Sequence, residues 1–271
     1  MCFRINTFYT FVEIFFDMLI DTHSHIYSED FNDDIEEVLQ NAYNNDVKKI
    51  VLPNIDSGSI KRLLDLSNSY PHVCYPLMGL HPTSVSNDFK EELSVVEYWL
   101  DKQKFYGIGE IGIDLYWDRT YIQEQKEAFR YQIKLAKSRK LPIVIHVRES
   151  FTEVHEIVKE EQDGTLNGVF HCFSGDEVEA QKVIDLGFLL GIGGVVTYKN
   201  STLPQVLKNV ELKNLVLETD APYLSPDPKR GRRNESSYLV YVAQKLAEIY
   251  QLPIKEIAEK TTANARRLFE I

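Results

Sequence analysis

The chain has 271 residues and a formal net charge of −11, with 44% hydrophobic and 26% charged residues. This length suffices for two small domains or one large α/β barrel, and the composition is typical of neither disordered nor fibrous proteins. The acidic balance argues against a dedicated nucleic-acid coat protein, which needs a broad basic face, but it leaves open an enzyme that holds a phosphate group locally.

Residues 1–17 precede the first regular pattern and are rich in aromatic side chains. Glu13 and Asp17 interrupt this segment and no small-residue cleavage site follows it, so we do not expect a signal peptide. No run approaches the roughly 20 apolar residues of a membrane span. We interpret residues 1–17 as an N-terminal extension of unclear role, Met18 as the functional start and residues 18–271 as a single domain.

Short apolar runs alternate with amphipathic helical patterns over the rest of the chain. The helical patterns repeat apolar residues at i, i+3, i+4 and i+7, as in residues 35–42, 89–100, 122–136 and 239–246, and one or two further helices are expected within 253–269. The eight apolar runs, expected to be strands, lie within 18–27, 48–54, 73–82, 106–114, 141–150, 168–176, 188–194 and 215–224.

These strands are continuously apolar, which is typical of a parallel sheet covered on both faces. Eight of them alternating with helices predict an α/β fold, a (β/α)8 TIM barrel, with a doubly wound open sheet as the competing architecture. The distribution of polar residues favours the barrel, because nearly every strand ends in an uncommon polar side chain. These residues are Asp21, His23, His25, His81, Glu110, Asp114, His146, Arg148, His171, Ser174, Glu218 and Asp220.

In an α/β barrel the carboxyl ends of the strands converge on one face, where active sites are built. Side chains two apart on a strand point the same way, so His23 and His25 both face this site. An isolated pair of this kind is more often a surface feature. Together with carboxylates and further imidazoles at equivalent strand ends, it predicts a metal site. The predicted ligands are His23, His25, Glu110, His146, His171 and Asp220.

Six ligands exceed the needs of one tetrahedral ion, whereas two ions roughly 3.5–4 Å apart would use them all. We expect Glu110 to bridge two divalent cations. His23, His25 and Asp220 would complete one shell, and His146 and His171 the other. The cations could be Zn, Mn or Mg, and the number of imidazoles favours zinc or manganese.

Six segments in this order carry a family resemblance: "IDTHSH", "GLHPTSV", "GEIGID", "IVIHVRES", "FHCFSGD" and "LETDAPYLSP…RGRRNE". Over residues 18–271 the chain resembles the TatD family of metal-dependent hydrolases, deoxyribonucleases of the amidohydrolase-like superfamily. The resemblance implies the same six ligands with Glu110 shared. It also implies a 3′ to 5′ exonuclease on DNA, in which a hydroxide bound to the dinuclear centre attacks the phosphodiester, Glu110 and Asp220 being catalytic and Asp220 acting as the base.

Other polar residues near the strand ends are candidates for substrate contacts or for orienting the ligands. His81 is expected to contact the scissile group and Arg148 a phosphate, while Asp114 and Glu218 are expected to orient ligands. The basic loop after the last strand, with Lys229, would offset the acidic net charge, unless it is only a solvated loop. Its expected substrate-binding residues are Arg230, Arg232 and Arg233.

Cys2, Cys74 and Cys172 provide no disulfide framework and favour a reducing, cytoplasmic location. Cys172 follows His171, so period-two alternation predicts that it points away from the metals into the barrel wall. The glycines of "LGIGG" in the seventh strand (190–194) indicate a close backbone approach near the site.

Two other functions compete with the nuclease reading. The same centre could hydrolyse an ester or amide, as a D-aminoacyl-tRNA deacylase does, although the basic loop suits a phosphate polymer better. A non-catalytic scaffold of the same fold is disfavoured by the complete ligand set. The expected partner is DNA, as a single strand or at 3′ ends. We expect no membrane association, no obligate protein partner and a monomer.

Overall fold

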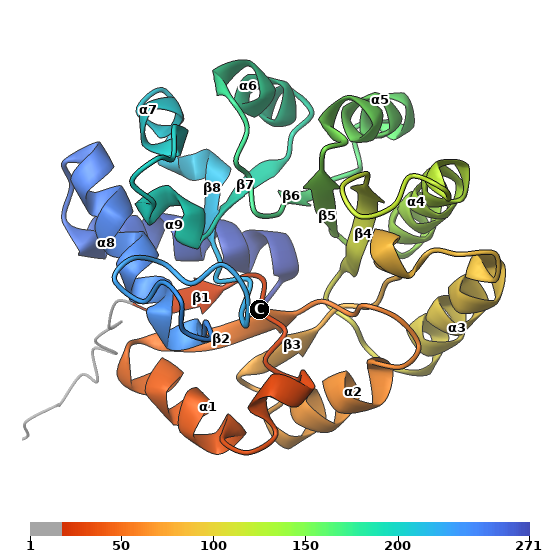
Figure 1. Cartoon of the computed structure of the whole chain (residues 1–271), viewed down its shortest axis with the longest axis horizontal. Coiled ribbons are helices and arrows are strands. Elements are labelled where there is room, and N and C mark those ends of the chain that lie inside the picture. Colours follow the sequence, from red (N-terminus) through yellow and green to blue (C-terminus); the bar gives the residue numbers. More distant parts are fainter. Residues whose placement is uncertain (1–17) are drawn as a thin grey trace, which may run out of the picture.

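A computed structural model describes residues 18–271 as eight parallel strands enclosed by a ring of helices (Figure 1). The proposed N-terminal extension, residues 1–17, lies outside the described residues. The strands are β1 Leu19–Asp21, β2 Val47–Leu52, β3 Cys74–Pro76, β4 Ile108–Asp114, β5 Ile143–Arg148, β6 Gly168–Phe170, β7 Leu189–Ile192 and β8 Leu215–Leu217.

The strands close into a barrel through two short seams. Strands β1–β2–β3 form one hydrogen-bonded set and β4 to β8 form the other, all in sequential parallel order. Parallel bridges join Met78 to Ile108 on one side and Ser24 to Ala221 on the other. The (β/α)8 prediction is therefore confirmed, and the doubly wound open sheet is excluded.

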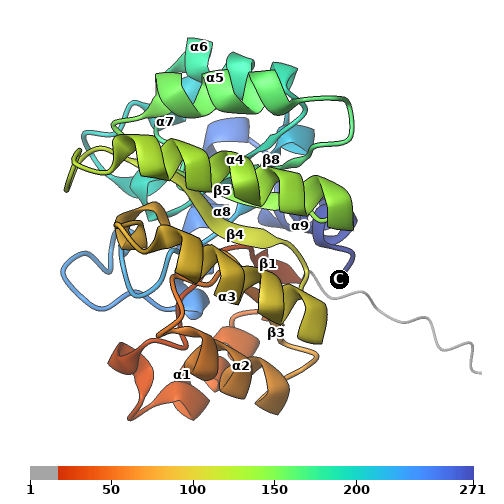
Figure 2. The same ribbon diagram turned by 90° about the vertical axis from the view of Figure 1, so that its right-hand side faces the viewer.

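Amphipathic helices pack around the barrel with their apolar faces inward (Figure 2). Residues 253–269, for which one or two helices were expected, form a single helix that begins directly after Pro253. No helix within residues 18–271 has the length and apolar character needed to cross a membrane. The helices are α1 Ile35–Asn44, α2 Ile60–Ser69, α3 Phe89–Lys102, α4 Ile122–Arg139, α5 Phe151–Glu161, α6 Glu177–Asp185, α7 Leu203–Leu207, α8 Leu239–Tyr250 and α9 Ile254–Phe269.

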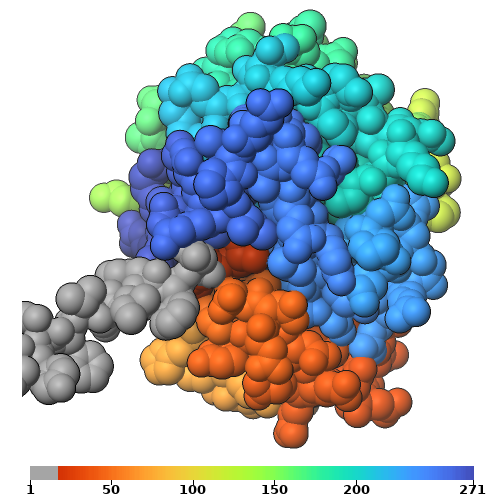
Figure 3. All heavy atoms as spheres, turned by 90° about the vertical axis from the view of Figure 1, so that its left-hand side faces the viewer, coloured from red at the N-terminus to blue at the C-terminus, as the bar shows by residue number. Residues whose placement is uncertain are grey.

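The last helix fastens the start of the described chain. Thr262 donates its hydroxyl to the carbonyl oxygen of Met18, and Arg266 contacts the sulfur of the same residue. Figure 3 shows this region in red between the blue C-terminal part of the chain and the orange part that follows β1. The first and last elements thus support each other.

The interior of the barrel is apolar at one end and polar at the other. Val144, Val169 and Val216 belong to a buried cluster inside the barrel. Because alternate residues of a strand share a face, the side chains two positions further on also point inward, and these are His146, His171 and Glu218. The apolar layer therefore forms the floor beneath the polar residues.

Candidate metal centre

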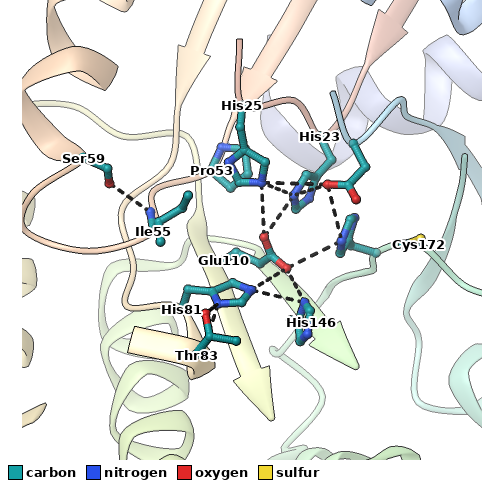
Figure 4. Close-up of polar contacts among 12 residues, drawn as sticks. His23, His25, Pro53, Ile55, Ser59, His81, Thr83, Glu110, His146 and Cys172 are labelled. Carbon is teal, nitrogen blue, oxygen red and sulfur yellow. Dashed lines mark hydrogen bonds and ion pairs between the residues drawn. The ribbon is translucent and has the colours of Figure 1, made fainter. Parts of the chain in front are cut away.

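The carboxylate of Glu110 on β4 lies at the centre of the polar cluster, between imidazoles (Figure 4). Its Oε2 atom lies 3.1 Å from Nε2 of His23 and 3.5 Å from Nε2 of His25. Its Oε1 atom lies 2.6 Å from Nδ1 of His146 and 3.5 Å from Nε2 of His171. Each oxygen thus faces a different pair of the predicted ligand imidazoles, which suits a carboxylate shared by two cations, and His81 also lies near Oε1.

Asp220 follows β8 and completes the set of six predicted ligands. Its Oδ1 lies 3.7 Å from Nε2 of His23 and 3.8 Å from Nε2 of His25. Three groups of donor atoms, each spanning no more than 4.8 Å, have the composition of metal sites: His23 with Glu110 and His171; His23 with His25 and Asp220; His81 with Glu110 and His146. Imidazole nitrogens and carboxylate oxygens in this arrangement suit divalent cations such as zinc or manganese.

Hydrogen bonds on the outer side of three imidazoles determine which nitrogen is free for a cation. Tyr27 donates its hydroxyl to the carbonyl of Pro53 at 2.6 Å, so it can only accept from Nδ1–H of His25, at 3.0 Å. In the neutral tautomer with this proton on Nδ1, Nε2 is the nitrogen with a free lone pair, and it faces Glu110. A ligating histidine typically donates its other N–H in this way.

Two carboxylates hold the other ligand pair. Asp114 Oδ2 lies 2.9 Å from Nε2 of His146, so Nδ1 is the nitrogen that faces Glu110. Glu218 Oε1 lies 3.0 Å from Nδ1 of His171, so Nε2 is the nitrogen that faces Glu110. These contacts are consistent with the orienting role predicted for Asp114 and Glu218, which stays a prediction.

His23 differs, because its Nδ1 atom is buried and has no hydrogen-bond partner among residues 18–271. Its ring instead stacks on that of His171, with centroids 3.6 Å apart and planes 17° apart. Packing rather than hydrogen bonding therefore orients this ligand.

His81 belongs to the third group of donor atoms, yet its hydrogen bonds disfavour metal ligation. The backbone N–H of Thr83 donates to Nδ1 of His81 at 3.2 Å, so the proton of the neutral ring is on Nε2. Burial lowers the pKa of His81 and keeps the ring neutral. Nε2–H lies 3.3 Å from Glu110 Oε1. A donor in this position suits a contact to an anionic substrate oxygen, which stays a prediction.

A cavity of about 840 Å³ opens above these ligands. Arg148 and Cys172 line it, together with five of the six predicted ligands and His81. The predicted orientation of Cys172 toward the barrel wall stays a prediction, and Figure 4 draws its sulfur on the side away from Glu110. Strand β6 ends at Phe170, and Cys172 adopts a left-handed conformation with φ 49°, so strand alternation no longer applies. Cys74, by contrast, is buried.

The basic loop after β8 lies beside this cavity rather than in its wall. Arg233 forms an ion pair with Asp34 at the start of α1, and the guanidinium carbon of Arg230 lies 3.8 Å from the centroid of the Tyr198 ring. Neither of them, nor Arg232, is among the residues that line the cavity. Their role in substrate binding stays a prediction.

Comparison with known proteins shows to which family this chain belongs. The family model for TatD-related DNases matches residues 20–270. The chain belongs to this family. It is 40% identical to the metal-dependent hydrolase YabD of Bacillus subtilis over 94% of this chain and 100% of that protein.

Solved structures give the same result for the fold of this TatD-family chain. The crystal structure of the TatD homologue YjjV from Escherichia coli superimposes with a TM-score of 0.88 at 31% identity, covering 93% of this chain and 98% of the other. A TatD-family hydrolase from Entamoeba histolytica gives a TM-score of 0.84 at 23% identity, covering 93% and 98% of the two chains. The protein is therefore a metal-dependent hydrolase of the TatD family.

Charges within this TatD-family site are strongly coupled. Burial opposes ionisation of Glu110, but the surrounding imidazoles hold its pKa well below the usual range. Burial also opposes protonation of His171, yet Glu218, Glu110 and Asp220 outweigh it and raise the pKa of this imidazole to about 10. Burial raises the pKa of Asp220 to about 6.

We expect cation binding to release a proton from His171. Without a cation the ring is protonated at every pH below about 10, and a ligating Nε2 must be unprotonated. The apparent affinity for zinc or manganese should therefore rise about tenfold per pH unit between neutral and mildly alkaline pH. Titration calorimetry of chelator-treated protein in buffers of different ionisation enthalpy measures the proton count. Affinity that does not change with pH would contradict this expectation.

We also expect Asp114→Asn to weaken cation binding about 10- to 100-fold, the usual cost of losing a group that orients a ligand. The substitution removes the negative charge beside Nε2 of His146. Competition with a chromogenic chelator measures the affinity. Asp118→Asn is a matched control, because Asp118 lies four residues further along and is exposed. Equal affinities of the two variants would refute the role of Asp114.

No role was predicted from the sequence for Asp21 or Tyr27 of this TatD-family site. Asp21 is fully buried and accepts hydrogen bonds from the backbone N–H and the hydroxyl of Thr219, which fixes the strand end just before Asp220. Tyr27 follows the "HSH" motif by two residues, a spacing that could have indicated its contact with His25. The predicted close backbone approach is present, because a Cβ atom on Gly194 would lie 2.2 Å from the backbone carbonyl oxygen of Leu224.

Proposed function

We propose that this hydrolase is a deoxyribonuclease that removes nucleotides from the 3′ end of DNA. The observation that carries the proposal is the shared cavity. Five of the six predicted cation ligands line it together with a guanidinium, Arg148, and a neutral N–H donor, His81. Such a set matches the charge and the oxygen acceptors of a phosphodiester. The name of the matching family model agrees with it.

In this proposal, different residues bind the cations and the phosphate. Glu110 and the histidines around it would hold two divalent cations, which supply Lewis acidity toward phosphoryl oxygens and make water acidic enough to react at neutral pH. Arg148 and Nε2–H of His81 would bind the non-bridging oxygens and stabilise their growing charge.

Asp220 is the best-placed proton acceptor. Its side chain is 14% exposed, against 3% for Glu110, so water reaches it more readily. It lies near His23 and His25, on the same side of the cluster as Glu110 Oε2. We assign to Asp220 the orientation of the attacking water and the acceptance of its proton.

A single-stranded oligonucleotide with different fluorophores at its two ends tests the proposal. Metal-loaded protein should release the 3′ label first and leave a shrinking ladder of 5′-labelled products, and chelator-treated protein should leave the DNA intact. Binding should weaken with salt, because each phosphate contact displaces bound counterions, and the few contacts available in an acidic protein should keep the overall affinity modest. Intact DNA in a sample shown to hold two cations per chain would overturn the proposal, and aminoacyl esters would then be the next substrates to assay.

A further inference from the structure

Two large aromatic side chains stand exposed at the mouth of the cavity. Trp117 is 69% and Tyr223 56% exposed, and both line the cavity that holds the metal ligands. They follow β4 and β8, which are four strands apart in an eight-stranded barrel and therefore lie on opposite sides of the mouth. Exposed apolar surface of this kind beside a site commonly marks a binding surface.

We propose that Trp117 and Tyr223 form a stacking site for unpaired nucleobases, which makes the enzyme select single-stranded ends. The proposal rests on the nuclease function proposed above and names the part of the substrate that these residues bind. Bases stack on aromatic rings whatever their identity, so such a site recognises a strand without reading its sequence. The bases of an intact duplex are already stacked and could not reach it.

The backbone around Trp117 is held by the site itself. Oδ1 of Asp114 accepts the backbone N–H of Tyr116 at 2.9 Å and that of Trp117 at 3.4 Å, while its Oδ2 holds His146. Arg119 closes the loop by donating to the carbonyl of Leu115 at 3.0 Å. The ring is thus positioned relative to a predicted cation ligand, as pre-organised binding requires.

Tyr223 is held in a similar way on the other side. Its backbone N–H donates to the carbonyl of Asp220 at 2.8 Å, and its own carbonyl accepts from Asn234, which is fully buried. The ring centroid lies 6.4 Å from that of His25. A base stacked on Tyr223 would therefore lie beside the proposed catalytic centre.

The charge around Trp117 supports a nucleotide rather than an apolar occupant. The guanidinium carbon of Arg148 lies 3.9 Å from the Tyr116 ring centroid and 5.2 Å from that of Trp117. A cation held against aromatic rings can bind a phosphate while the free ring faces stack on bases. A purely apolar partner would leave this guanidinium without a counter-charge.

The fluorescence of Trp117 reports stacking without requiring hydrolysis. The chain has two tryptophans, so Trp99→Phe leaves Trp117 as the only one. Metal-loaded Trp99→Phe protein is titrated with a phosphorothioate oligothymidylate, which resists cleavage, and with a blunt-ended duplex. We expect quenching by the single strand at concentrations where the duplex has no effect. No quenching by the single strand would overturn the proposal, whether or not the protein cleaves DNA.

Kinetics test the contribution to catalysis. Trp117→Ala should raise KM for a single-stranded oligonucleotide and lower kcat/KM roughly 5- to 150-fold, the range expected for one stacked base. Tyr98→Ala is the matched control, because Tyr98 is 55% exposed on α3 and does not line the cavity. Abasic residues at the 3′ end should slow the wild type by a similar factor and Trp117→Ala no further.

The two proposals fail in different ways. Cleavage of DNA by Trp117→Ala at the wild-type rate would overturn the stacking site and leave the nuclease function standing. Wild-type protein that quenches with single strands but cleaves none would support the stacking site and overturn the nuclease function.

Discussion

Glu110→Gln should abolish hydrolysis and reduce the bound cations to at most one per chain. Each oxygen of Glu110 faces a different pair of imidazoles, Oε2 toward His23 and His25 and Oε1 toward His146 and His171. The amide of glutamine has one oxygen and no charge, so it cannot bind a cation on each side as the carboxylate could. A metal centre contributes several kcal/mol to a hydrolysis, and losing about 4 kcal/mol lowers the rate roughly a thousandfold.

Metal analysis by mass spectrometry, together with kcat/KM on the labelled oligonucleotide, measures both effects. Glu149→Gln is the matched control, because Glu149 is an exposed carboxylate that does not line the cavity. This control should keep two cations and full activity. A Glu110→Gln protein that binds two cations would show that the carboxylate is not shared.

Asp220→Asn should lower kcat by about 10²- to 10⁴-fold, the usual contribution of a general base, while most of the metal stays bound. The asparagine side chain keeps the shape and one oxygen near His23 and His25, but it cannot accept a proton. Metal content and kcat measured on the same preparation separate this outcome from that of Glu110→Gln.

The pH–rate profile distinguishes loss of a proton acceptor in Asp220→Asn from a structural disturbance of the site. Burial raises the pKa of Asp220 to about 6 when no cation is bound, and bound cations lower it again, so this carboxyl is protonated only under acidic conditions. The limb of the pH–rate profile that rises from acid should therefore flatten in Asp220→Asn. A variant within tenfold of the wild-type kcat, with the limb intact, would assign the base to another group.

The barrel and the ligand strands could be predicted from sequence because both follow from simple periodicities. Continuous apolar runs indicated strands buried on both faces. A polar residue at the end of a run, such as Glu110 or His146, indicated the carboxyl end of the barrel. The residues that meet at the site are scattered in sequence, and only the closure of the barrel brings them together.

Residues outside strict strand geometry could not be placed in this way. Cys172 lines the cavity and has a left-handed backbone, so strand alternation does not determine its orientation. Arg233 lies near the site in sequence, but the ion pair with Asp34 draws it toward α1. Which ring nitrogen of His81 carries the proton depends on the backbone N–H of Thr83. This contact cannot be predicted from the sequence.

The contact between the ends of β1 and β8 has a consequence for when the metal site can form during folding. The backbone N–H of Asp220 donates to the carbonyl of His23 at 2.9 Å, so residues from opposite ends of the chain meet inside the site. During synthesis, a growing chain would carry five of the six ligands long before it could close the ring. Contacts of such wide sequence separation form late in folding. We therefore expect a chain truncated before β8 to lack high-affinity cation binding. Tight binding of cations would then occur only after synthesis has passed β8.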